Sequence, residues 1–460
     1  MRAATTTMPG DAVLRLLSTA WQCWNGGLVL SLVLAATAGC TRRTFVDEVS
    51  VEASGVTVKD VSHDHLRDQW PMWRGPTNDG IAPEGQDPPT HWSTSENVRW
   101  VADVPGRGHA SPVVVSDRVI LATAIEPLEQ QLVVAYARDT GDLVFQTLIH
   151  EGNFPRRNEV HQKASHANST VACDGSRIYA TFFHAGSITT TALDMEGNIV
   201  WRQDLGPFIS KFGYAPSPLL YQSLVIVAAD HSGGGFLVAL DSETGRVAWR
   251  VARPPGASCS SPMIARIDGQ DRIFLCGCDQ VVAYDPHTGR RVWSANETTE
   301  TTCGTMVAWN GMVYASGGYP RSQTVALSHD GVKLWDNRIK VYEPSLLVTD
   351  GHVYAISDNG IAYCWSATDG RERWKHRLGG NFSASPVLCN DKIFVSNLSG
   401  KHFVLAANPE EFQEIAVNSL GDDCYASPAI VGGDIFLRLG MGIGEQRREK
   451  LVCLRRASDN

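Results

Sequence analysis

The sequence predicts an all-β fold: an eight-bladed β-propeller of four-stranded antiparallel blades, closed by an N-terminal strand that completes the last blade. Three observations support this prediction. A Ser-Pro marker, or a degenerate copy of it, recurs eight times at spacings of 40 to 58 residues. A second motif, which ends in an aromatic residue, recurs inside most of these units. The chain also holds 42 Gly and 13 Trp, a composition that favours short strands and tight turns.

Each repeat unit is predicted to form four strands. The marker begins the unit, a short apolar strand follows it, and a polar turn leads to a second strand. Asp-Gly, Asn-Gly and Thr-Gly mark the turns, where Gly adopts a positive φ at little cost. The units begin at Ser111, Ser169, Ser217, Ser261, Thr305, Ser345, Ser385 and Ser427. Four strands at a period of roughly 40–45 residues are typical of a propeller blade.

The third and fourth strands carry the motif Ala-x-Asp-x-x-Thr-Gly-x-x-x-Trp. Complete copies end at Trp249 and Trp293, and looser copies end at Phe145, Trp201, Trp335 and Trp374. We expect a small residue, the Ala, on one blade to make room for the indole of the next blade, so that burial of the indole holds the blades together.

The last unit ends at Arg456 without a fourth strand or a Trp. The missing strand is found at residues 97–100, before the first marker. Pairing of these two segments would leave no open edge where the first and last blades meet. The alternative is a seven-bladed ring in which the second unit, whose Ser-Pro is degraded, is an insertion.

The N-terminus reads as a targeting segment. An apolar run at residues 28–38 has the length of a signal-peptide core and is followed by Gly39 and Cys40. This ending resembles a bacterial lipobox, so residues 1–39 are expected to be a signal peptide and Cys40 the site of lipid attachment. Thr41 favours the outer membrane. Ordinary signal cleavage and an uncleaved anchor remain alternatives. Residues 40–69 are expected to be a tether, and residues 70–456 the propeller.

Composition limits the function. Of 460 residues, 19% are charged and 43% are hydrophobic, which excludes a disordered chain and allows a sizeable core. The net charge of −9 argues against nucleic-acid binding, which normally needs a basic surface. Loss of Cys23 and lipidation of Cys40 would leave nine of the 11 cysteines, so at least one thiol is free.

The repeat motif resembles the tryptophan-docking repeat of the PQQ-like, or quinoprotein-like, propellers over about residues 70–456. Two branches of that superfamily matter here. One contains PQQ-dependent dehydrogenases, and the other contains non-catalytic propellers such as the lipoprotein of the outer-membrane barrel-assembly machinery. The lead-in at residues 70–80 also resembles bacterial PQQ-like propellers. The resemblance implies the fold, whereas the motif residues hold blades together and need not touch a substrate.

Resemblance to the dehydrogenases would imply an adjacent Cys-Cys pair, a Trp floor, and Glu, Asn and Asp ligands for Ca²⁺. The chain has no Cys-Cys pair, and its nearest approach is Cys276-Gly277-Cys278, whose two thiols would share one face of a strand. It also has no Cys-x-x-Cys-His motif for a c-type haem. No cofactor is therefore expected, and PQQ with calcium is kept as the alternative.

The loop that leads into each first strand is the place to look for a site. That strand lines the propeller axis, so residues two and three before each marker are expected at the channel mouth. The candidates are His109, His166, Tyr214, Cys259, Cys303, Tyr342, Glu343, Phe382, Cys424 and Tyr425. The His, Cys and Glu side chains among them would suit zinc or copper. A polar and aromatic lining with no ligand is the plainer interpretation. The longest insertion, which holds His161 and His166, is the best candidate for a functional loop.

We therefore predict a non-catalytic, exported propeller lipoprotein that acts as a protein-binding scaffold in the cell envelope. It would bind an envelope partner through a propeller face or its loops, contact the membrane through its lipid anchor, and work as a monomer. Outer-membrane protein assembly is the role implied by the resemblance. The alternatives are a PQQ-dependent oxidoreductase, and a small-molecule or metal binder at the channel mouth.

Overall fold

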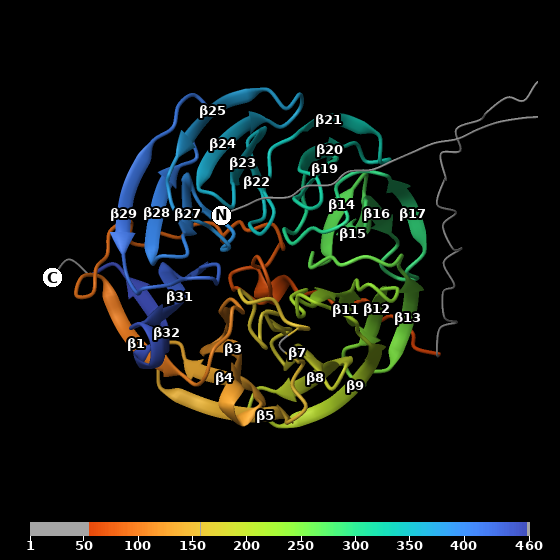
Figure 1. Ribbon diagram of the computed structural model, residues 1–460, viewed down its shortest axis with the longest axis horizontal. Coiled ribbons are helices and arrows are strands. Elements are labelled where there is room, and N and C mark those ends of the chain that lie inside the picture. The colour runs from red at the N-terminus through yellow and green to blue at the C-terminus, as the bar shows by residue number, and fades with distance from the viewer. Residues whose placement is uncertain (1–54, 157, 458–460) are drawn as a thin grey trace, which may run out of the picture. The chain divides into compact units, whose positions relative to one another are not determined.

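The computed structural model describes residues 55–156 and 158–457, which form a ring of eight four-stranded antiparallel sheets (Figure 1). Blades 1 to 4 contain β2 (Val113–Val115), β3 (Arg118–Ile125), β4 (Gln130–Ala137) and β5 (Leu143–Glu151); β6 (Ala172–Cys173), β7 (Arg177–His184), β8 (Ser187–Asp194) and β9 (Ile199–Pro207); β10 (Leu219–Tyr221), β11 (Leu224–Ala229), β12 (Phe236–Asp241) and β13 (Val247–Ala252); β14 (Met263–Ile267), β15 (Gln270–Gly277), β16 (Gln280–Tyr284) and β17 (Arg291–Ala295).

Blades 5 to 8 contain β18 (Val307–Trp309), β19 (Met312–Gly317), β20 (Gln323–Leu327) and β21 (Lys333–Asn337); β22 (Leu347–Thr349), β23 (His352–Ile356), β24 (Ile361–Ser366) and β25 (Glu372–Arg377); β26 (Val387–Cys389), β27 (Lys392–Ser396), β28 (Lys401–Ala406) and β29 (Glu414–Ser419); β30 (Ala429–Val431), β31 (Asp434–Met441), β32 (Arg448–Arg455) and β1 (Val98–Val104). Three short 3₁₀ helices are η1 (Asp64–Leu66), η2 (Glu126–Leu128) and η3 (Gly444–Gln446).

The core lies between the blades. Middle strands such as β3 and β4 are buried along almost their whole length, because each is covered by a neighbouring blade on both faces. Outer strands such as β5 alternate between exposed and covered positions. The described residues contain no helix that is long and apolar enough to cross a membrane.

The eight-bladed prediction is confirmed, and the seven-bladed alternative is wrong. The second unit forms a complete blade, β6 to β9. The predicted closure is also confirmed, because β1 pairs with β32 in an antiparallel ladder, with Val101 opposite Val452. The last blade is therefore built from both ends of the propeller.

The tryptophan contact between blades differs from the expected one. Trp249 packs against Gly289 in the turn of the next blade, where a Cβ would lie 2.5 Å from the indole. Its Nε1–H donates a 2.9 Å hydrogen bond to the Pro286 carbonyl of that blade. Ala239, by contrast, stands opposite Trp249 within the same sheet. The small residue that admits the indole is thus the turn Gly of the neighbouring blade, and the Ala clears space within its own blade.

The Ser-Pro markers form a ring of hydrogen bonds around the axis. In seven places the backbone N–H of one marker residue donates to the side-chain hydroxyl of the marker in the next blade. The pairs are Ser111 to Thr170, Thr170 to Ser217, Ser217 to Ser261, Thr305 to Ser345, Ser345 to Ser385, Ser385 to Ser427, and Ser427 to Ser111, at 2.8–3.0 Å. The marker of the second blade is Thr170 rather than Ser169, so the repeat register there shifts by one residue.

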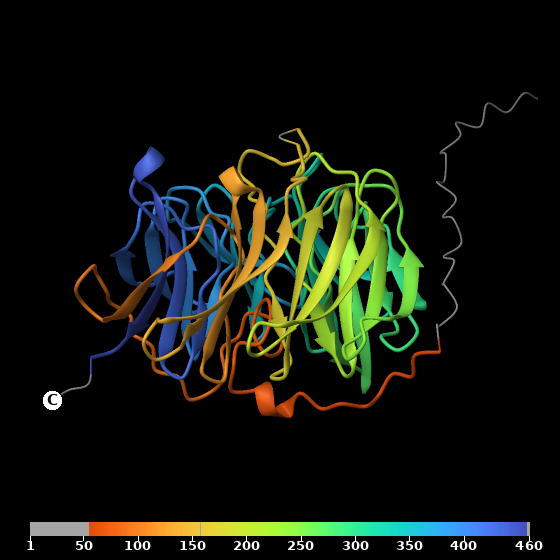
Figure 2. The ribbon, with the colours of Figure 1, turned by 90° about the horizontal axis from the view of Figure 1, so that it is seen from below.

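Residues 55–82 lie on the face opposite the long insertion (Figure 2). Lys59 pairs with Glu243 at 2.8 Å, and Trp70 forms a bridge with Val114 near the axis. The predicted signal peptide, Cys40 and the first part of the predicted tether lie outside the described residues, whereas the end of that segment contacts the blades.

Candidate functional site at the channel mouth

A cavity of about 270 Å³ lies on the axis beneath the insertion between blades 1 and 2. Every blade contributes the residue two positions before its ring hydroxyl, because the loop approaches the axis in the same way in each repeat. These residues are His109, Asn168, Ala215, Cys259, Cys303, Glu343, Ser383 and Tyr425. Tyr342, three positions before its ring hydroxyl, also lines the cavity. The structure thus brings together six of the ten predicted mouth residues.

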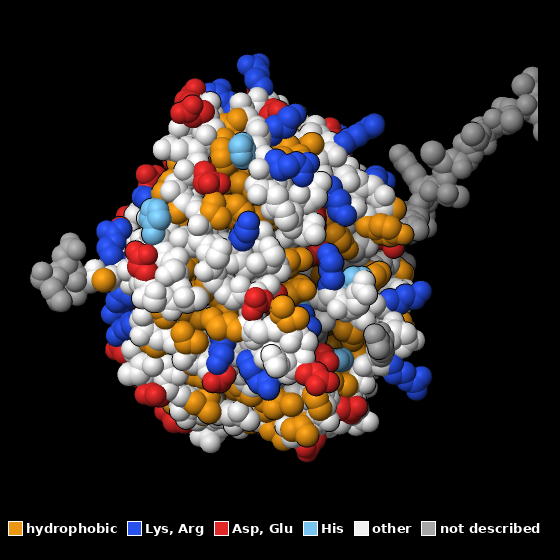
Figure 3. Space-filling model, turned by 60° about the vertical axis from the view of Figure 1, so that its left-hand side comes forward, with side chains coloured by type: hydrophobic (Ala, Val, Ile, Leu, Met, Phe, Trp, Pro, Cys, Tyr) orange, Lys and Arg blue, Asp and Glu red, His pale blue; other side chains and the backbone are white. Residues whose placement is uncertain are grey.

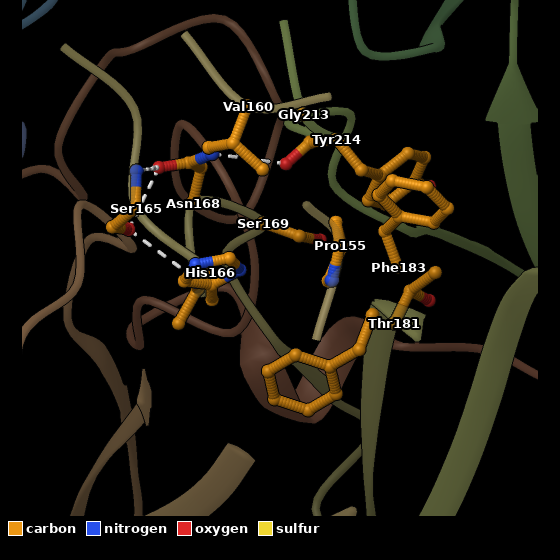
Figure 4. A pocket seen from close by; sticks show the side chains of 12 residues that line it. Pro155, Val160, Ser165, His166, Asn168, Ser169, Thr181, Phe183, Gly213 and Tyr214 are labelled. Carbon is orange, nitrogen blue, oxygen red and sulfur yellow. Dashed lines mark hydrogen bonds between the residues drawn. The ribbon is translucent and has the colours of Figure 1, made fainter. Parts of the chain in front are cut away.

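The other four predicted residues are placed elsewhere. Phe382 and Cys424 are buried in the core, since alternate residues of an extended segment point to opposite sides. His166 and Tyr214 line a small second pocket of about 10 Å³ beside the mouth (Figure 4). His166 lies outside the mouth cavity because the ring residue of its blade is Thr170. The mouth position two residues before Thr170 is therefore Asn168.

Asn168 holds the wall between the two pockets. Its side-chain amide donates a 3.1 Å hydrogen bond to the Tyr214 carbonyl, and its oxygen accepts from the backbone N–H of Ser165 at 2.8 Å (Figure 4). The insertion is therefore tied to blade 3 and is not simply a solvated loop.

The insertion also reaches across the mouth. Lys163 Nζ lies 3.3 Å from a carboxylate oxygen of Glu343, which comes from the loop leading into blade 6. The Ser383 hydroxyl donates to the same carboxylate. Asp358 fixes this loop, since its carboxylate accepts the backbone N–H groups of Tyr342 and Glu343 at 2.9 and 3.0 Å. Burial raises the pKa of Asp358. The Lys163–Glu343 pair thus bridges the opening.

Two rings stack on the wall formed by the loops leading into blades 1 and 8. His109 and Tyr425 have ring centroids 4.1 Å apart and planes within 3° of each other. Burial, and then the charge of Arg107, hold the pKa of His109 well below its usual value. Nε2 of His109 is buried and has no hydrogen-bond partner among the described residues. This wall therefore offers a neutral imidazole to the cavity.

Cys259 and Cys303 form a third wall. A hydrogen bond from Cys303 lowers the pKa of the Cys259 thiol, and the same contact raises the pKa of Cys303 well above its usual value. The seven other described cysteines are buried, and none of the nine is in a disulfide.

Trp73 closes the cavity from below. The repeat pattern does not single out Trp73, because the lead-in segment lies outside the repeats. Its indole N–H donates a 2.8 Å hydrogen bond to the Thr305 hydroxyl, and the side chain lines the cavity floor. The lead-in reaches the centre of the ring (Figure 1). The cavity is therefore a cup open at one end.

Comparison with known proteins identifies the family. A family model described as outer membrane protein assembly factor BamB matches residues 129–376 and 321–415. The chain belongs to the BamB family. BamB of Yersinia pestis is 25% identical over 328 residues, which cover 66% of this chain and 77% of that protein.

Solved structures show the same fold. BamB from Moraxella catarrhalis superposes with a TM-score of 0.55 at 16% identity, over 78% of this chain and 99% of that one. Quinohemoprotein alcohol dehydrogenase from Comamonas testosteroni gives 0.62 at 13% identity, over 85% and 82%. At these identities the likeness extends to the propeller and not to any chemistry.

The mouth of this BamB-family propeller does not fit calcium and PQQ. Of the described residues that line it, Glu343 is the one carboxylate, and Lys163 and Ser383 already engage it. Calcium takes about six to eight oxygen ligands. Cys278 lies in the turn after β15 and not on the strand with Cys276, so the shared face does not form.

The predicted soft-metal site does not assemble either. Among residues 55–156 and 158–457, no three His, Cys, Asp or Glu side chains are grouped so that they could hold a metal ion.

Proposed function

We propose that this protein is a non-catalytic scaffold in outer-membrane protein assembly, which binds a partner through its mouth face, defined as the loops on the insertion side of the ring. Its membership of the BamB family supports the role. The observation that carries the choice of face is that four of the five most exposed large hydrophobic side chains among the described residues lie on its loops.

The mouth face collects these side chains from four connections. Ile443 is 83% exposed beside η3, Tyr319 is 62% exposed between β19 and β20, and Leu128 is 57% exposed in η2. Ile209 and Phe212 add 57% and 42% between β9 and β10. In Figure 2, η2 and η3 project from the same face, opposite η1. Exposed apolar side chains of this kind mark protein-binding surfaces.

The sides of the ring also carry exposed apolar side chains, but these are less exposed than Ile443 and Tyr319; Leu143 of β5 reaches 54% and Val200 of β9 reaches 46%. On the side drawn in Figure 3, hydrophobic side chains reach the surface between Lys, Arg, Asp and Glu side chains. The partner's loop or strand would dock on the mouth face without chemistry.

The N-terminal segment is compatible with a lipid anchor at Cys40. His63 hydrogen-bonds the Gln222 carbonyl at 2.9 Å, and Lys59 pairs with Glu243, so this segment leaves the propeller on the face opposite the mouth. An exported monomer anchored in this way to the outer membrane would keep its mouth face free for the partner.

The test is genetic. Depletion of the protein should lower the amounts of β-barrel proteins in the outer membrane, and the wild-type gene should restore them. Cys40→Ser should remove lipid labelling and weaken complementation. Unchanged barrel-protein amounts after depletion would contradict the assembly role.

A small ligand in the mouth is the second candidate. The cavity volume and the Lys163–Glu343 pair favour it, since both charges face one enclosed space. Thermal-shift screening of amino-acid and carboxylate ligands against the wild type and Lys163→Ala tests this candidate.

A further inference from the structure

Two cysteines occupy equivalent positions in neighbouring blades. Cys259 precedes Ser261 by two residues, and Cys303 precedes Thr305 by two residues, so both lie at the mouth position of the repeat. They are the two partly exposed thiols among the nine described cysteines. Solvent and small molecules in the mouth cavity can therefore reach this pair, while the other described thiols are enclosed.

The pair lies at the junction of blades 4 and 5, called the seam here, where the ring of marker hydrogen bonds is interrupted. Between the described blades 4 and 5, no hydrogen bond runs from the Ser261 N–H to the Thr305 hydroxyl. That hydroxyl instead accepts from Trp73. A covalent link between Cys259 and Cys303 would tie the blades directly above this seam.

The backbone already holds the two residues together. The Cys259 N–H donates to the carbonyl of Thr302, the neighbour of Cys303, at 2.8 Å. A disulfide requires Cα atoms about 4.4–6.8 Å apart and sulfurs about 2.05 Å apart. The two loops thus meet across the seam, and both cysteines line the mouth cavity.

We propose that Cys259 and Cys303 form a reversible interblade disulfide by exchange with a small external disulfide that enters the mouth cavity. The Cys259 thiolate attacks one sulfur of the external disulfide, forms a mixed disulfide and releases one thiolate. The deprotonated Cys303 then attacks Cys259 Sγ and releases the second thiolate. The two protons lost by the protein go to the released thiolates. The two protein thiols are oxidised, and the external disulfide is reduced to two thiols.

The surroundings of the two cysteines indicate which sulfur attacks the external disulfide first. The contact with Cys303 lowers the pKa of the Cys259 thiol, and the same contact raises the pKa of Cys303, so the thiolate is favoured at Cys259. Cys259 is therefore the attacking sulfur and Cys303 the resolving one. An exported protein meets an oxidising compartment, where such a bond would persist. The exchange itself can be tested in vitro, so its outcome is independent of the assembly role.

The test treats the full chain in detergent with glutathione disulfide, alkylates the remaining thiols, and maps the peptides by mass spectrometry. Trypsin separates Cys259 from Cys303 and leaves Cys276 and Cys278 together on a third peptide. The expected product is a Cys259–Cys303 linked peptide and a Tm raised by a few °C. Cys303→Ala should trap glutathione on Cys259, and Cys259→Ala should form neither product.

Cys364→Ala is the matched control, because it removes a buried thiol in blade 6 and should oxidise like the wild type. The proposal fails if the wild type keeps both thiols alkylatable, retains glutathione without forming the link, or links other cysteines. The wild-type map decides this even if a variant does not fold.

Discussion

The backbone N–H of Ser427 donates a 3.0 Å hydrogen bond to the hydroxyl of Ser111, which lies 316 residues earlier in the chain. This bond joins the last blade to the first at the axis, while the β1–β32 ladder joins the two ends at the rim. The marker Ser or Thr is thus explained by its hydroxyl, because seven of the eight accept a backbone N–H from the neighbouring blade and the eighth, Thr305, accepts from Trp73.

Ser111→Ala should destabilise the propeller. It leaves the buried Ser427 N–H without an acceptor, which costs about 1–3 kcal/mol. Urea unfolding measures the loss. Ser95→Ala, at an exposed position, should change the unfolding free energy by less than about 0.5 kcal/mol. Equal effects of the two variants would show that the marker ring adds no stability.

Gly289→Ala should be more harmful than Gly269→Ala. Both glycines lie in blade 4 turns, with φ of +70° and +73°, so both variants carry the strain of a left-handed Ala, about 1–2 kcal/mol. Only at Gly289 would the Cβ meet the Trp249 indole. The clash should add about 1–3 kcal/mol. Similar unfolding free energies for the two variants would remove the argument for indole docking.

Stability should fall in mild acid because of His402. Nε2–H of its ring donates a 2.9 Å hydrogen bond to the Leu420 carbonyl, and Nδ1 lies 2.7 Å from the Ser396 hydroxyl. Burial lowers the pKa of His402 to about 4. The unfolded chain therefore binds a proton below pH 6.5 that the folded chain does not bind until near pH 4. The stabilisation is present above pH 6.5 and falls by about 2 kcal/mol between pH 7 and pH 5.

His402→Gln is the comparison for this pH dependence, since it keeps a side-chain N–H donor but does not titrate. Chemical unfolding at pH 7 and pH 5 should show a steeper loss of stability for the wild type than for this variant. Parallel losses would assign the acid sensitivity to other groups.

The fold could be predicted from the sequence because it is built from repeats. The marker recurs in all eight blades and a Gly turn before the fourth strand recurs in six of them, so blade number and closure could be predicted from spacing. The site was harder to predict, because a one-residue shift to Thr170 moves His166 out of the mouth and Asn168 into it. Trp73 belongs to no repeat, and only the three-dimensional ring brings it beneath Thr305.

The scaffold account makes a direct prediction against the oxidoreductase alternative. Addition of PQQ and Ca²⁺ to the full chain should change neither Tm nor visible absorbance, and alcohols and sugars should not reduce a dye. The physical reason is that Glu343 is the one carboxylate among the described residues of the mouth. Saturable binding with turnover would make the mouth residues catalytic and would overturn the scaffold account.

Binding through the mouth face is the central claim, and an affinity measurement tests it most directly. The purified full chain would be titrated with subunits of the barrel-assembly machinery. The double variant Phe212→Ser and Ile443→Ser should weaken binding at least tenfold. Val332→Ser, which removes a side chain 59% exposed in the β20–β21 turn on the opposite face, should bind like the wild type. Equal affinities for all three proteins, or a loss confined to Val332→Ser, would contradict the account.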